Sequence, residues 1–237
     1  MIKLYAMTSP NVVKIFLALE EMALPYQVVP VDVFGGDQFS AEFRKLNPAA
    51  KVPVIVDEQG PGGQPFTLFE SGAILLYLAD KTGKFLSADP ATRFHTVQWM
   101  MVQMTGIGPM FGQYVHFLRF APPGNEYALN RYRTQMHRFL DVIEGRLAEA
   151  PYLGGIDYSI ADIATYPWAR TLPGLAGPDA AQRYPKITDW AAKIGERPAA
   201  KRALAAVEEV RSKGTPFATA KPETLDRVFG RGAHTAA

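Results

Sequence analysis

The sequence predicts an α+β fold, in which a small mixed α/β region is followed by a region made of helices alone. Up to about residue 88, apolar residues alternate in some segments as in strands and recur every three to four residues in others as in helices. After Asp89-Pro90, every periodic segment has the helical spacing. With 237 residues, 48% of them hydrophobic, the chain can bury a substantial core.

The first region reads as a compact layer of strands and helices. A strand, a helix and a second strand form a parallel unit, and a helix, an antiparallel hairpin and a last helix follow. Pro30 would interrupt a central ladder, so the second strand belongs at a sheet edge. Ser71 and Gly83 suit the start and the end of the last helix. The expected elements are strands at 2–7, 26–32, 52–58 and 66–70 and helices at 11–22, 40–47 and 71–83.

The second region, from about residue 92 to 207, reads as a set of helices. Gly106, Gly108 and Pro109 interrupt its first long run, which predicts two helices or one bent helix. Ser159 and Asp162 form a capping-box pattern, with Asp in place of the usual Glu, at the start of a buried helix. The other expected helices lie at 127–148 and 187–198, with a shorter helix after them.

Composition excludes several classes of function. The chain has no cysteine, so disulfide scaffolds, cysteine nucleophiles and thiolate zinc sites are ruled out. Its four histidines are far apart in the sequence, and no metal site is expected. A net charge of +2 argues against a nucleic-acid partner. No apolar run reaches the length of a membrane span and the first residues do not resemble a secretion signal, so we expect a cytoplasmic protein without a membrane partner.

Three short segments are candidates for a ligand site. Ser9-Pro10-Asn11 lies between the first strand and the first helix, where α/β folds place ligands. Lys51-Val52-Pro53 precedes a strand, and proline forces Val52 into an extended conformation, as in an ordinary turn before a strand. If the Val52–Pro53 bond is cis, the Val52 backbone is left unpaired and an extended peptide could pair with it as an added strand. Glu70-Ser71 begins a helix and suits an α-amino acid end, or is a simple helix cap with an acidic neighbour.

Taken together, these segments resemble the cytosolic glutathione transferases. The matching pieces are SPN at 9–11, KVPV at 51–54, FESGAILLYLA at 69–79 and YSIADI at 158–163, and the resemblance extends to about residue 205. GGDQF at 35–39, QW at 98–99, GIGPMFGQ at 106–113 and NRY at 130–132 look most like the bacterial nu class, whose members are glutathione-dependent disulfide-bond reductases.

The resemblance implies a thioredoxin-like glutathione-binding domain over residues 1–86, an all-helical domain over 92–210 and a C-terminal tail over 211–237. It also implies a cis Val52–Pro53 bond. The residues that it assigns to glutathione binding are Asn11, Gln38, Lys51, Val52, Pro53, Glu70, Ser71 and Arg131.

The sulfur of glutathione is expected to meet donors at the start of the first helix. The Asn11 side chain, the neighbouring backbone N–H groups and the hydroxyl of Ser9 or Thr8 could stabilise a thiolate there. The nu class carries threonine where this chain has Ser9, so the choice between Ser9 and Thr8 stays open. Tyr5 is a rival hydroxyl, but its place in an apolar strand favours the core.

Other candidates have two interpretations each. Gln38 is a peptide contact or a polar loop residue, and Arg131 is a carboxylate contact or a solvated helix residue. Four aromatic residues at helical spacing could form the wall of an electrophile pocket or the seam between the domains. They are Phe111, Tyr114, Phe117 and Phe120. The three tryptophans and Asp162 are interpreted as structural.

Because the chain has no cysteine, any thiol chemistry must come from glutathione, without a metal. We expect a homodimeric transferase that reduces a small disulfide with glutathione. The alternatives are conjugation of glutathione to apolar electrophiles and a non-catalytic module that binds glutathione or supports oligomerisation. Phe217 and Phe229 are apolar anchors in a polar tail, which predicts that the tail packs over the cleft or over a partner.

Overall fold

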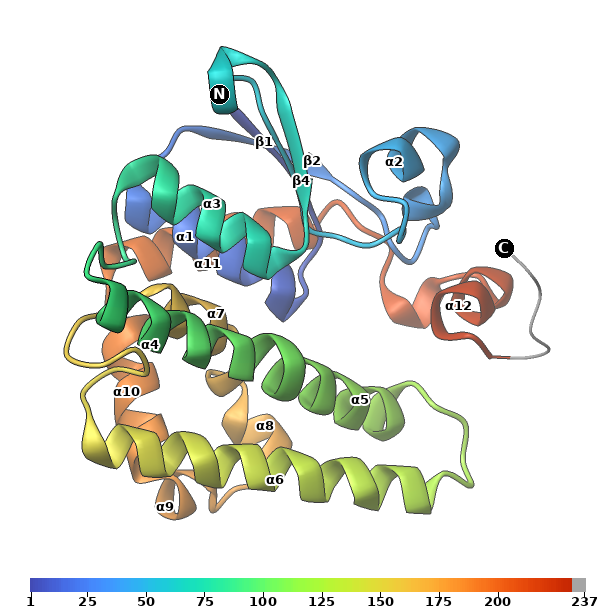
Figure 1. The fold of residues 1–237 in the computed structure, drawn as a ribbon. Coiled ribbons are helices and arrows are strands. Elements are labelled where there is room, and N and C mark those ends of the chain that lie inside the picture. Colours follow the sequence, from blue (N-terminus) through green and yellow to red (C-terminus); the bar gives the residue numbers. More distant parts are fainter. Residues whose placement is uncertain (232–237) are drawn as a thin grey trace.

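The computed structural model describes residues 1–231 and begins with a four-stranded mixed sheet and three α-helices (Figure 1). The strand order is β2-β1-β3-β4, with β1 parallel to β2 and antiparallel to β3, and β3 antiparallel to β4. The expected order of elements is confirmed. The elements are β1 (Ile2–Ala6), α1 (Pro10–Met22), β2 (Tyr26–Pro30), α2 (Ala41–Leu46), β3 (Val54–Asp57), β4 (Phe66–Phe69) and α3 (Ser71–Thr82).

Proline and burial explain the place of the first two strands. β2 is an outer strand and ends at Pro30, which lacks the N–H that a central strand would need. In β1, Ile2, Leu4 and Ala6 are buried and alternate with half-buried residues, as expected of a central strand. The hydrophobic pattern therefore sets the register of the sheet.

The helix α1 lies in the middle of the molecule and is almost wholly buried. It packs against α3, α7 (Ile160–Ala169) and α11 (Pro198–Arg211), and α1 and α3 lie between the sheet and α7 (Figure 1). All residues from Val12 to Leu19 are buried, including Lys14. This position explains the nearly continuous apolar run in the sequence, because no face of the helix is left to water.

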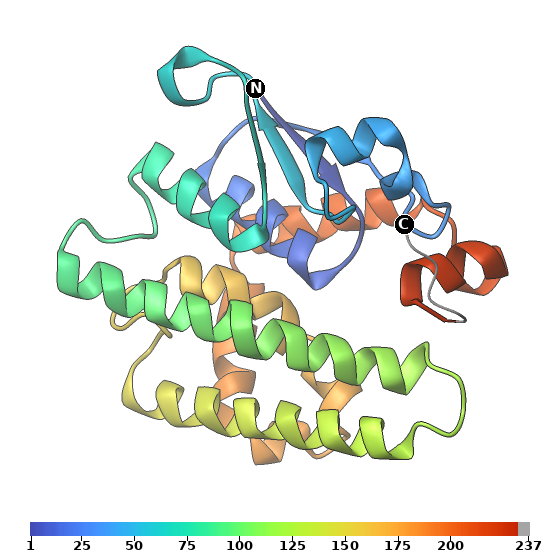
Figure 2. The same cartoon turned by 45° about the vertical axis from the view of Figure 1, so that its right-hand side comes forward.

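The second region is helical, as predicted. The interruption at residues 103–109 is a π-helical segment, Gln103–Ile107, and α4 and α5 follow one another through it along nearly the same direction (Figure 2). A Cβ on Gly106 would lie 2.3 Å from the ring of Phe139, so this glycine allows close packing on α6. The remaining helices are α4 (Pro90–Val102), α5 (Gly108–Arg119), α6 (Glu126–Glu149), α8 (Leu172–Ala176), α9 (Ala180–Arg183) and α10 (Pro185–Gly195).

One expectation about the last part of the chain needs correction. The helix after residue 198 is not the shorter one, because α11 has 14 residues and α10 has 11. The tail also contains a helix that the sequence analysis did not identify, α12 (Pro222–Phe229), in which Leu225 is buried and Val228 and Phe229 are half-buried. Residues 232–237, which the expectation for the tail included, lie outside the described residues.

The tail packs across the two domains. Phe217 and Phe229 have ring centroids 5.8 and 6.2 Å from that of Phe34 in the first domain, and both lie 4.9 Å from the ring of Phe120, which follows α5. The Arg227 guanidinium lies 4.0 Å from the centre of the Phe39 ring. Within the described residues, the two phenylalanines thus hold the tail against both domains of the same chain. That the tail covers the cleft or a partner stays a prediction.

Candidate functional site

A cavity of about 360 Å³ lies between the sheet domain and the start of α5. It brings together all three segments that the sequence singled out, and it adds residues of the helical domain. Its volume is within the usual range of small-molecule sites. The lining residues are Asn11, Asn47, Lys51, Val52, Pro53, Glu70, Ser71, Gln103, Met104, Gly108, Pro109 and Gln113. We refer to it as the interdomain pocket.

The loop before β3 presents its backbone to the interdomain pocket. The Val52–Pro53 bond is cis, as the resemblance implied. The ladder of β3 begins only at Val54, so the Val52 backbone lies outside it. Asn47 holds the loop, because its side-chain amide donates to the Lys51 carbonyl at 2.7 Å and its Oδ1 accepts from Ala49 N at 3.0 Å. The sequence analysis missed Asn47, although asparagine before proline is a known turn signal.

The start of α3 forms a second wall of the pocket. Glu70 has φ +68° and ψ 111°, a backbone conformation that residues other than glycine rarely adopt. Its carbonyl accepts from Ile74 N at 2.9 Å, and Ser71 follows as the first residue of the helix. Such strain persists where the surroundings enforce it and is often found at binding sites. The strained turn places a carboxylate beside the positive end of a helix.

The start of α1 contributes Asn11. Val12 and Val13 donate their N–H groups to the Ser9 carbonyl at 2.9 and 3.0 Å, and Pro10 has no N–H. The expectation of several free backbone donors is therefore wrong, because the Ser9 carbonyl uses two of them. Within residues 1–231, the donors that this helix start leaves for a ligand are the backbone N–H and the side-chain amide of Asn11.

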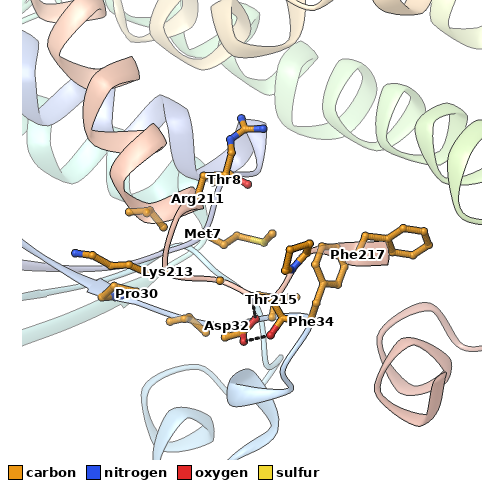
Figure 3. A pocket seen from close by; sticks show the side chains of 14 residues that line it. Met7, Thr8, Pro30, Asp32, Phe34, Arg211, Lys213, Thr215 and Phe217 are labelled. Atoms are coloured by element: carbon orange, nitrogen blue, oxygen red, sulfur yellow. Dashed lines mark hydrogen bonds between the residues drawn. The ribbon is translucent and has the colours of Figure 1, made fainter. Parts of the chain in front are cut away.

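A second cavity, also of about 360 Å³, is lined by Met7 and Thr8, which precede the same turn (Figure 3). The tail closes it, because Thr215 donates its N–H and its hydroxyl to Asp32 at 3.0 and 2.6 Å. Phe34 and Phe217 form part of its apolar wall (Figure 3). Thr8 and Asn11, three residues apart, thus face different cavities.

Besides Thr8, three other predicted residues are not among those that line the interdomain pocket. Gln38 is buried and donates to the Val33 carbonyl at 3.1 Å. Arg131 is exposed on α6 and lines a separate shallow cavity with Tyr127 and Asn130. Ser9 is the N-cap of α1 and forms no side-chain capping bond. For these residues the assignment from the resemblance stays a prediction.

A buried polar pair beneath the pocket escaped the sequence analysis. Lys14 Nζ donates to Gln103 Oε1 at 2.8 Å, and both side chains are fully buried. Burial lowers the pKa of Lys14 to about 7, although the negative charge of Glu70 opposes this shift. The one available signal was a lysine inside an apolar helical run.

The four aromatic residues that the sequence places at helical spacing, in and just after α5, divide between two roles. Phe111 packs edge-on against Trp168, and the Tyr114 hydroxyl donates to the Leu175 carbonyl at 3.3 Å, so both belong to the core of the helical domain. Phe117 stacks on Tyr132, and Phe120 meets the tail. None of these aromatic rings lines the interdomain pocket.

Residues 1–231 contain neither a cluster of metal-binding side chains nor a helix able to span a membrane. No group of three or more His, Cys, Asp or Glu side chains that could hold a metal ion was found there. In the same range, no helix combines the length and the apolar character needed to cross a membrane.

Two family models match the chain. Residues 8–81 match the N-terminal domain of glutathione S-transferase, and residues 107–198 match its C-terminal domain. The disulfide-bond oxidoreductase YfcG of Escherichia coli is 46% identical over 209 residues, which cover 86% of this chain and 94% of YfcG. The disulfide-bond oxidoreductase YghU of the same organism is 37% identical, with 85% of this chain and 73% of YghU covered.

Solved structures agree with these matches. A glutathione transferase family member from Pseudomonas fluorescens with two glutathione bound has a TM-score of 0.82 and 44% identity, covering 86% of this chain and 92% of that one. A glutathione transferase from Pseudomonas putida, with one glutathione disulfide bound per subunit, has a TM-score of 0.81 and 42% identity, covering 86% and 90%.

Proposed function

Because the chain belongs to the glutathione S-transferase family, we propose that it binds glutathione in the interdomain pocket and uses it to reduce small disulfides. The observation that carries the proposal is the convergence of Asn11, the Lys51–Pro53 loop and the Glu70–Ser71 helix start on one cavity in a chain without cysteine. Relatives named disulfide-bond oxidoreductases at 46% and 37% identity support the same activity.

Each wall of the pocket suits one part of the tripeptide. The start of α3 offers Ser71 and helix N–H groups to a carboxylate, and the Glu70 carboxylate suits an ammonium group on the same carbon, as in the γ-glutamyl end. The Val52 backbone can pair with the extended peptide as an added strand. This arrangement directs the cysteinyl sulfur towards Asn11.

The reaction proceeds by thiol–disulfide exchange. Donation from Asn11 stabilises the glutathione thiolate, which attacks one sulfur of the disulfide, forms a mixed disulfide and expels the other sulfur as a thiolate. A second glutathione thiolate then attacks the glutathione sulfur of the mixed disulfide and releases the second thiol. Two glutathione molecules are oxidised to one glutathione disulfide, and one substrate disulfide is reduced to two thiols.

A conjugating transferase is the second candidate. The cavity lined by Thr8 has apolar walls that include Met7, Val31 and Phe34, and Thr8 precedes Asn11 by three residues. An apolar electrophile bound there would be close to the turn before α1. In that case a carbon–sulfur bond forms, and glutathione disulfide is not a product.

A pair of rate measurements tests the proposal. Disulfide reduction is followed by coupling glutathione disulfide to glutathione reductase, and conjugation is followed with an aromatic halide. We expect glutathione-dependent reduction of a small disulfide well above the uncatalysed rate and a slower conjugation. A chain that is retained on immobilised glutathione but accelerates neither reaction would be the non-catalytic binding module.

We also propose that the protein is a cytoplasmic homodimer. Most soluble oligomers are symmetric dimers, and the resemblance to the family points to the same assembly. Three apolar side chains are exposed and available for contact with a second copy of the chain: Phe94 and Met101 on α4 and Val142 on α6. Light scattering at micromolar concentration should give twice the chain mass of 26.1 kDa, and a mass equal to that of one chain would refute the dimer.

A further inference from the structure

Lys14 is a charged group placed where the proposed reaction does not require one. It lies one helical turn after Asn11 on α1, and its side chain is fully buried between the two domains. Its Nζ donates at 2.8 Å to Oε1 of Gln103, which belongs to the π-helical segment and lines the interdomain pocket. Through this bond Lys14 is connected to the pocket wall.

Stability does not explain the pair. Gln103 Oε1 accepts from Lys14, and this orientation of the glutamine leaves its amide nitrogen as a buried donor without a partner within residues 1–231. An unsatisfied buried group costs about 1–3 kcal/mol. A Cβ on Gly108 would lie 2.9 Å from that nitrogen, so Gly108 makes room for this orientation. The fold therefore contains a destabilising buried donor at the edge of a pocket, which points to a role in binding.

The charges around the pocket are unbalanced for glutathione. Its lining contains one cation, Lys51, and one anion, Glu70, which cancel. Glutathione has two carboxylates and one ammonium group and is therefore a net anion. A protonated Lys14 would give the site the single positive charge that matches this ligand.

Most other charged groups on the elements packed against α1 have ion-pair or hydrogen-bond partners. Glu70 is the charged neighbour that acts on Lys14. Asp162 of α7 accepts from Ser159, Arg197 before α11 and Arg202 of α11 pair with Glu21 and Glu20 of α1, and Asp80 and Lys81 of α3 pair with Arg93 and Asp57. Lys201 and Arg211 of α11 pair with Glu196 and Glu208, and Glu209 is exposed. Lys14 is thus a buried group at the pocket wall whose protonation can respond to a bound anion.

We propose that Lys14 is a buried positioning residue that takes up a proton when glutathione binds, holds the pocket wall through Gln103 and supplies the positive charge that balances the anionic peptide. This inference rests on the proposed glutathione site and deepens it. Burial disfavours the charge in the free protein, and a bound anion favours it, so binding and protonation reinforce each other. Affinity should therefore fall as the pH rises above neutrality.

Calorimetry with S-methylglutathione tests the proposal, because this ligand has the same charged groups but no thiol proton to release. Binding enthalpies measured at pH 7.5 in buffers of different ionisation enthalpy give the number of protons taken up. Lys14 has a pKa of about 7 in the free protein and is mostly neutral at that pH. We expect an uptake of roughly half a proton or more per site.

Three variants and a control isolate the source of the proton. Lys14→Met should abolish the uptake and weaken binding on the order of tenfold. The double variant Lys14→Met with Gln103→Leu removes both polar groups and guards against a folding defect. Gln103→Glu gives Lys14 a carboxylate partner that keeps it charged, so the uptake should disappear although the lysine remains. Lys193→Met, which removes an exposed lysine on α10, should behave as wild type.

The outcomes separate the two proposals. Absence of S-methylglutathione binding to the wild-type protein refutes the glutathione site itself. Binding without proton uptake, or uptake that persists when Lys14 is replaced, refutes the role of Lys14 and leaves the glutathione site intact. Loss of the uptake in the lysine variants and in Gln103→Glu, with the control unchanged, supports it.

Discussion

At the start of α1, the Ser9 carbonyl accepts from the N–H groups of Val12 and Val13. The backbone N–H and side-chain amide of Asn11 are left to donate to a ligand. Removing a preorganised donor to a developing anion lowers catalysis by about a hundredfold or more. We predict that Asn11→Ala lowers kcat/KM for disulfide reduction by about two orders of magnitude and changes the affinity for glutathione much less. Steady-state kinetics and calorimetric binding on the same preparation measure both effects.

Two hydroxyl variants are controls for that prediction. Ser9→Ala should lose less activity, because the Ser9 side chain caps nothing and does not line the interdomain pocket. Tyr5 packs edge-on against Phe43 with ring centroids 6.2 Å apart, so Tyr5→Phe should retain activity. Full activity in Asn11→Ala together with none in Tyr5→Phe would mean that the site is of the tyrosine type.

The buried Lys14 should also make the free energy of unfolding depend on pH. Its pKa is about 7 in the folded protein and has the ordinary value of 10.5 when unfolded, so between these values the unfolded chain binds the extra proton. The stability of the free protein should therefore rise with pH in this window, by roughly 2 kcal/mol between pH 7 and pH 9. Urea unfolding at both pH values gives the difference in unfolding free energy between the wild type and Lys14→Met/Gln103→Leu. This difference should change with pH by the amount that Lys14 contributes. The same difference at pH 7 and pH 9 would contradict the prediction.

Among the elements, α7 depends on the carboxylate of Asp162. The Ser159 N–H and hydroxyl donate to its Oδ2 at 3.0 and 2.9 Å, and Leu153 N and Trp190 Nε1 donate to its Oδ1 at 2.9 and 3.0 Å. Burial raises its pKa to about 6, so it is ionised at neutral pH. Asp162→Asn replaces one carboxylate oxygen, which accepts hydrogen bonds, with an NH2 group that can only donate. This group would face the N–H and O–H donors that the oxygen now accepts from. The substitution should cost about 2–4 kcal/mol in urea unfolding, with glutathione affinity unchanged in the folded fraction.

The tail is the other element with a testable role. Burial would raise the pKa of Asp32, but hydrogen bonds from Thr215, Gly35 and Phe34 outweigh it and lower the pKa. Deleting residues 214–237 removes the Thr215 bonds and the aromatic contacts, and opens the cavity beside Thr8. We expect a Tm lower by about 5–10 °C and an altered KM for the disulfide. Unchanged melting and kinetics would show that the tail is dispensable.

Elements could be predicted from the sequence where periodicity is strong. The four strands, the two long helices of the bundle and the capping box of α7 were all identified, because each has a local pattern. The short helices α8 and α9 have five and four residues, too few for a period to show. The length of α11 was underestimated because its packing on α1 stabilises it more than its sequence pattern indicates.

At the scale of the whole molecule, the site is a product of domain packing. The segments at Asn11, Lys51 and Glu70 could be predicted, since helix starts and X-Pro turns are local features. Gln103 and Lys14 could not, because they meet only when the π-helical segment lies against α1. The same packing leaves Gln38 and Arg131 outside the pocket lining, a distinction that no sequence pattern carries.

The central claim is that a chain without cysteine reduces disulfides with thiols that come only from glutathione. The most direct test is the product balance, measured by mass spectrometry, after the protein has acted on a small disulfide and glutathione without glutathione reductase. The account predicts one glutathione disulfide and two substrate thiols for each disulfide consumed, with the mass of the protein unchanged. A glutathione conjugate as the final product, or a covalent adduct on the protein, would contradict it.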